Sequence, residues 1–180
     1  MKKSGKIFST IAILLLLSLN HSEGGVNFPK YISEDYKPYL HAWLSSHPSY
    51  RIAVETDCIY CADSIERMRK QKYGDWKPLP HYQPYYTIGD FNSDSVDDFA
   101  IAVIDESKTE KKFLILIFNG PFNTPSQTAP AFVSQPLDLS NEGMFYGAPR
   151  PKPWRLLVGP FESEGRMLIP QGKTYKWDGH

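Results

Sequence analysis

The sequence has only two cysteines and five histidines, and its 20 basic and 20 acidic residues balance. A balanced charge provides no basic surface of the kind that binds nucleic acid or anionic lipid. Nothing in the spacing of the few histidines indicates a nucleophile with its general base. The sequence therefore favours a non-catalytic protein, with a hydrolase or an inhibitor of one as a more distant alternative.

Long hydrophobic runs are also missing. The apolar run near the N-terminus, residues 11–17, is too short to span a membrane, and three lysines precede it within the first six residues. This order is typical of a secretory signal peptide, which we place at residues 1–24, ahead of a single domain at 25–180. Cleavage leaves 17 of the 20 basic and 19 of the 20 acidic residues. Because no cysteine lies near the cleavage site, we expect a secreted or periplasmic protein without a membrane anchor.

Both cysteines, Cys58 and Cys61, follow the signal peptide, and an oxidising compartment favours a disulfide between them. Because this disulfide closes so small a loop, it stabilises the folded state by at most about 2 kcal/mol on the chain-entropy model. The same C-x-x-C spacing between a strand and a helix also suits thiol–disulfide exchange, although Asp57 would raise the pKa of a neighbouring thiol. A zinc site is a third interpretation, but it lacks a second pair of ligands.

The most distinctive stretch is residues 89–101, G-D-F-N-S-D-S-V-D-D-F-A-I, where oxygen-bearing side chains recur at alternating positions. Carboxylates so close repel one another unless a cation lies between them. Calcium accepts six to eight oxygen ligands in flexible geometry, main-chain carbonyls included. We predict a calcium site whose ligands are the side chains of Asp90, Asn92, Asp94 and Asp98 and the carbonyl of Val96.

This loop is not an EF-hand, because the twelfth residue is Ile101 rather than a glutamate, and strand-like segments flank it. The pattern Asp90-x-Asn92-x-Asp94-x-x-x-Asp98 before a strand resembles the calcium loop of FG-GAP/VCBS repeats. It departs from that pattern at Ser95, where the family usually has a glycine that adopts a positive φ. A bound ion would cross-link the two flanking strands and screen the carboxylates, so we expect mainly structural calcium, with an ion that bridges to a ligand as the alternative. An ion-free turn rich in Asp, Asn and Ser is the alternative.

The remaining pattern predicts an α+β fold, an antiparallel β-sheet with two N-terminal helices packed on it. Ser33 is the expected N-cap of a first helix that ends by His47, and a second helix is expected over 62–72. The run F-L-I-L-I-F at 113–118 is apolar on both faces and predicts an interior strand. The other expected strands are 50–55, 85–88, 99–104, a weak edge strand at 132–139, 155–158, 167–169 and 174–177.

Three further segments, P-Y-Y-T-I-G-D-F-N-S-D, F-N-G-P-F and V-G-P-F-E-S, resemble an uncharacterised family of small secreted bacterial proteins with one such loop. That resemblance implies compartment and fold only. Aromatic residues in stretches rich in prolines and loops suit contacts with sugars or proteins, but we favour a role in covering the core; they are Trp76, Tyr82, Tyr85, Tyr86 and Trp154. We predict a calcium-binding module that recognises a protein or an envelope component. The alternative is a periplasmic redox or folding accessory that uses Cys58 and Cys61.

Overall fold

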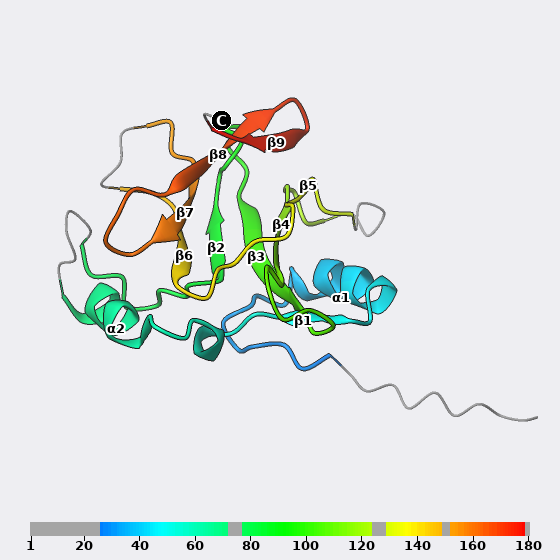
Figure 1. Cartoon of the computed structure of the whole chain (residues 1–180). Coiled ribbons are helices and arrows are strands. Elements are labelled where there is room, and N and C mark those ends of the chain that lie inside the picture. Colours follow the sequence, from blue (N-terminus) through cyan, green and yellow to red (C-terminus); the bar gives the residue numbers. More distant parts are fainter. Residues whose placement is uncertain (1–25, 72–76, 124–128, 149–151, 179–180) are drawn as a thin grey trace, which may run out of the picture.

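The computed structural model describes residues 26–71, 77–123, 129–148 and 152–178. These residues form two α-helices, one 3₁₀ helix and nine strands in two antiparallel sheets, which confirms the α+β class (Figure 1). Among them, no helix has the length and apolar character needed to cross a bilayer. The predicted signal peptide, residues 1–24, lies outside the described residues.

The first sheet is built around one central strand. Its members are β1 (Tyr50–Ile52), β2 (Tyr86–Gly89), β3 (Asp98–Asp105), β4 (Phe113–Phe118) and β5 (Phe132–Val133). One edge of β3 pairs with β4, and the other edge pairs with β1 at one end and β2 at the other. The short strand β5 pairs with the far edge of β4, as expected of a weak edge strand. The predicted interior strand is therefore confirmed as β4.

Both faces of β3 and β4 are buried, and alternate residues enter two separate hydrophobic clusters. This alternation follows from the period of two along a strand. Phe99, Ile101 and Val103 face the cluster that contains helix α1 (Lys37–Ser46). Ala100 and Ala102 face the cluster that contains the second sheet and helix α2 (Ala62–Lys70). The first sheet thus lies between two unlike layers.

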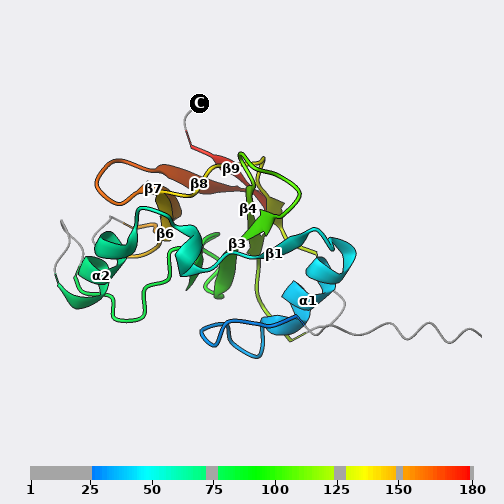
Figure 2. The same ribbon diagram turned by 60° about the horizontal axis from the view of Figure 1, so that its bottom comes forward.

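The second sheet is a four-stranded meander. It consists of β6 (Glu142–Phe145), β7 (Leu156–Pro160), β8 (Arg166–Gln171) and β9 (Thr174–Trp177), in that order. Figure 2 shows it across one side of the first sheet, with α1 on the side away from it and α2 near β6. The expected packing of both helices on one sheet is therefore wrong in detail. The helices lie on opposite sides, and a second sheet occupies the face next to α2.

Some element boundaries also differ from those expected. Ser33 does not cap α1, because residues before the helix form turns in which the carbonyl of Ser33 accepts the N–H of Tyr36. The helix begins at Lys37, with Pro38 in its first turn, where the missing N–H costs nothing. Helix α2 ends at Lys70, while residue 72 lies outside the described residues. Strand β1 ends at Ile52 and leads into the 3₁₀ helix Glu55–Asp57.

Candidate functional site

The Asp-rich loop joins β2 to β3, as the sequence predicts, and the paired residues Gly89 and Asp98 close it. The carboxylate of Asp90 accepts the N–H of Asp94 at 2.9 Å and the N–H of Ser95 at 3.0 Å. The side-chain oxygen of Asn92 accepts the N–H of Asp94 at 2.9 Å as well. The side chains of Asp90 and Asn92 therefore turn inward over the loop rather than outward into solvent.

Asp94 completes this arrangement from the exposed side of the loop. Its Oδ1 accepts the N–H of Val96 at 2.9 Å, and its Oδ2 accepts the amide of Asn92 at 3.0 Å. Ser93 and Ser95 have φ angles of 66° and 69°, in the left-handed region. The positive φ that the resemblance implies at position 95 is thus present. Serine adopts it at some cost that glycine avoids.

Asp98 has a different environment from the other loop carboxylates. Its side chain is fully buried at the start of β3. Its Oδ2 accepts the N–H of Phe91 at 3.0 Å and lies 3.1 Å from the hydroxyl of Tyr175, and its Oδ1 accepts the N–H of Gly120 at 3.1 Å. Burial raises the pKa of Asp98 to about 6, although these hydrogen bonds oppose the rise. Asp98 therefore ties the loop to the end of β4 and to β9.

The oxygens of the loop fit calcium in part. Asp90, Asp94 and the amide oxygen of Asn92 lie in one turn, and each carboxylate oxygen that accepts one N–H keeps a further lone pair. Asp98 has fewer lone pairs free for a cation, because its two oxygens already accept three hydrogen bonds. Among the described residues, no group of three or more His, Cys, Asp or Glu side chains is arranged to hold a metal ion. Calcium at this loop would thus depend on amide, main-chain and water oxygens besides Asp90 and Asp94.

Tyr146 and Arg155, from the second half of the chain, also support the loop, and no sequence pattern indicates either contact. The hydroxyl of Tyr146 donates to the carbonyl of Asp90 at 2.9 Å, and its ring lies against Gly89. A Cβ at Gly89 would lie 2.1 Å from that ring, so the close approach requires glycine. Arg155 donates to the hydroxyl of Ser93 at 2.7 Å. These contacts join residues 56 and 62 positions apart, which no local pattern reveals.

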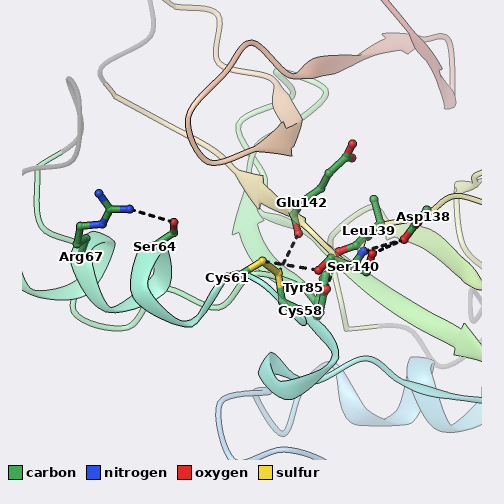
Figure 3. Close-up of a disulfide and its surroundings, with 9 residues drawn as sticks. All are labelled: Cys58, Cys61, Ser64, Arg67, Tyr85, Asp138, Leu139, Ser140 and Glu142. Atoms are coloured by element: carbon green, nitrogen blue, oxygen red, sulfur yellow. Dashed lines mark hydrogen bonds between the residues drawn. A yellow bond between two sulfur atoms is a disulfide. The ribbon is translucent and has the colours of Figure 1, made fainter.

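The Cys58–Cys61 disulfide is present, as predicted. Cys61 is fully buried and Cys58 is only 5% exposed, whereas Ile59 and Tyr60 between them are 64% and 78% exposed. The sulfur of Cys58 lies 3.7 Å from the carbonyl oxygen of Glu142, at the start of β6 (Figure 3). The bridge therefore seats the start of α2 against the second sheet, and its sulfurs face protein rather than solvent.

No protein-family model matches the chain, and neither a curated protein nor a solved structure matches it. The FG-GAP/VCBS resemblance therefore remains a prediction based on the loop residues.

Proposed function

We propose that the protein is an exported, non-catalytic binding domain whose β2–β3 loop takes up calcium as a mainly structural ion. The observation that carries this proposal is that the side-chain oxygens of Asp90, Asn92 and Asp94 gather in one exposed turn, where each accepts a main-chain N–H of the loop. Their oxygens are the hard ligands that calcium prefers, and the carbonyl of Val96 follows two residues after Asp94. Asp98 holds the base of this turn, and its Oδ1, which accepts only the N–H of Gly120, keeps a lone pair for the ion.

A structural role for the ion follows from where the loop lies. The turn joins β2 to β3, and it contacts Tyr146 and Arg155, which directly follow β6 and precede β7 of the second sheet, respectively. An ion between Asp90 and Asp94 would remove their mutual repulsion and fix the turn against both contacts. Outside the cytoplasm calcium is abundant, so a site of modest affinity is filled there.

Export is supported by two other features. The N-terminal pattern of residues 1–24 is that of a signal peptide, and a disulfide persists in an oxidising compartment. We propose a protein or envelope component as the partner. Thiol–disulfide exchange is the less favoured function, because both sulfurs are buried and an exchanging disulfide has to be accessible to an attacking thiolate.

Thermal unfolding in calcium and in chelator tests the proposal. Binding to the native state alone adds stability as RT ln(1 + [L]/Kd), so 10 mM calcium should raise the Tm by about 3–6 °C. Asp94→Asn should abolish this shift, because it keeps an oxygen for the Val96 N–H but removes the charge. Asp97→Asn is the matched control, since Asp97 is an exposed neighbour outside the ligand set. Equal Tm values in calcium and chelator for the unmodified protein would remove calcium from the account.

A further inference from the structure

A pocket of about 440 Å³ lies beside strand β2, bounded by β6 and by residues 79–83. Four tyrosines, Tyr31, Tyr82, Tyr86 and Tyr146, contribute to its lining. Its size is in the range of small-molecule sites, which combine aromatic walls with a few polar groups. We call it the tyrosine pocket. Neither the proposed calcium site nor the disulfide gives this pocket a role.

The charges around the tyrosine pocket limit what it can bind. Among the described residues, no Lys, Arg, Asp or Glu lines it. A phosphate or carboxylate ligand would therefore lose its hydration without gaining a Lys or Arg partner, and the imidazole of His81 lies on an exposed residue, where an ion pair contributes little. The polar side chains that line it are the amide of Gln83, the hydroxyls of Thr87 and the tyrosines, and the imidazole of His81. This chemistry matches a ligand with an apolar face and several uncharged hydroxyl or amide groups.

A peptide added as a strand to β2 fits less well. The N–H of Ala102 donates to the carbonyl of Tyr85, so in this register Thr87 also faces β3, while Tyr86 and Ile88 present their main-chain groups at the other edge. Tyr86 already forms a bridge with Gln83 on that side. Ile88 alone therefore offers its N–H and C=O to an added strand, which is too few for β-augmentation.

We propose that the tyrosine pocket binds a neutral oligosaccharide, stacked by its apolar ring faces on the half-buried Tyr31 and Tyr146 and hydrogen-bonded to Gln83 and Thr87. Tyr82 and Tyr86, each 8% exposed, form the base of the pocket. This inference rests on the proposed function only in taking the chain to be a binding domain. Aromatic side chains supply large contact area with a polar tip, which suits sugar rings. One wall of the pocket is Tyr146, whose hydroxyl bonds the carbonyl of Asp90, so the pocket and the calcium loop share a side chain.

NMR titration of the full chain tests this directly. The probes are three neutral tetrasaccharides, made of N-acetylglucosamine, of α-1,4-linked glucose and of β-1,4-linked glucose. A tetragalacturonate is the anionic comparison, and an apolar hexapeptide is the peptide comparison. We expect at least one neutral tetrasaccharide to shift the amides of Thr87 and Ile88 in a saturable way. Gln83→Ala should weaken that binding by about tenfold, the value of one hydrogen bond of about 1.4 kcal/mol. Tyr60→Ala, which removes an exposed tyrosine elsewhere, should leave the affinity unchanged.

Three results would overturn the inference: no saturable shift with any neutral tetrasaccharide, binding of only the anionic sugar or the peptide, or equal loss in Gln83→Ala and Tyr60→Ala. Each titration is run in calcium and in chelator, and amide spectra of both variants confirm that they fold. Binding in chelator without a calcium effect on Tm supports the saccharide site and contradicts the calcium proposal. A calcium effect on Tm without saccharide binding supports the calcium proposal and contradicts the saccharide site.

Discussion

The hydroxyl of Tyr146 donates to the main-chain carbonyl of Asp90, 56 residues earlier, while its ring lies against Gly89. One side chain of the segment after β6 thus fixes the entrance of the Asp-rich loop. Phe91, fully buried, meets the same ring edge to face at 5.1 Å. The loop is therefore part of the packing between the two sheets, although its tip is exposed.

Tyr146→Phe should separate the packing role of this ring from its hydrogen bond. The ring stays in place, so the loss is that of one half-buried hydrogen bond, about 1 kcal/mol of unfolding free energy in urea. The calcium-dependent part of the stability should also shrink, because Asp90 is held less firmly. Tyr60→Phe, at a side chain that is 78% exposed, is the matched control and should change neither quantity. A calcium effect of full size in Tyr146→Phe would contradict the link between the ring and the ion.

Ser95→Gly should stabilise the loop. Ser95 has a φ of 69°, which glycine adopts without the contact between Cβ and carbonyl, so we expect a gain of about 0.5–1 kcal/mol. Ser93→Gly relieves a similar angle of 66° but also removes the hydroxyl that Arg155 contacts at 2.7 Å. Its gain should therefore be smaller. Urea midpoints in chelator give both values, and a loss of stability in Ser95→Gly would show that its backbone angle is not the limiting strain.

Stability should depend on pH through Asp98 when calcium is absent. The folded pKa of about 6 lies above the ordinary value, so protonation favours the folded state. This contribution is fully present below pH 3.8, the ordinary value, and is lost as the pH rises through 6. In chelator, the free energy of unfolding attributable to Asp98 should therefore rise by roughly 1–3 kcal/mol between pH 7.5 and pH 4.5.

Asp98→Asn should remove that dependence, which isolates Asp98 from the other carboxyl groups. Calcium should reduce it too, because a nearby cation favours the charged carboxylate. Denaturant unfolding at a series of pH values measures both effects. A variant with the same pH profile as the unmodified protein would assign the dependence to other groups.

The contribution of Asp57 to stability should have the opposite pH dependence to that of Asp98. Burial alone raises the pKa of its carboxyl, but the hydrogen bonds from Arg51 at 2.7 and 2.8 Å and from the Val54 N–H outweigh it and hold the pKa below its ordinary value. Asp57→Asn should cost about 1–3 kcal/mol at pH 7. That cost should diminish as the pH falls through the lowered pKa, because the carboxylate of the unmodified protein is then protonated. Asp35→Asn, at an exposed carboxylate, should cost much less at every pH.

Features set by neighbouring residues were predictable from the sequence. The run at 113–118 is apolar at every position, so it could only be an interior strand, and Cys58 and Cys61 are close enough in the chain to pair. The turn residues between two strand-like segments likewise located the loop.

Long-range relationships were not predictable in the same way. Strand β6 has the sequence Glu-Gly-Met-Phe, which lacks an alternating pattern, so neither it nor the complete second sheet was expected. Tyr146, Gly120 and Tyr175 reach the loop only through the tertiary fold. Burial of Asp98 was hidden for the same reason. The sequence marks its carboxyl as one more loop oxygen, whereas two of its three partners come from β9 and from the end of β4.

Direct titration of the chelator-treated protein with calcium, followed by the amide signals of residues 90–98, tests the central claim most closely. We expect saturable shifts with one calcium per chain, a loss of affinity of at least about tenfold in Asp94→Asn, and no loss in Asp97→Asn. Amide signals of the loop that do not respond to millimolar calcium in the unmodified protein would contradict the account and leave the loop as an ion-free turn.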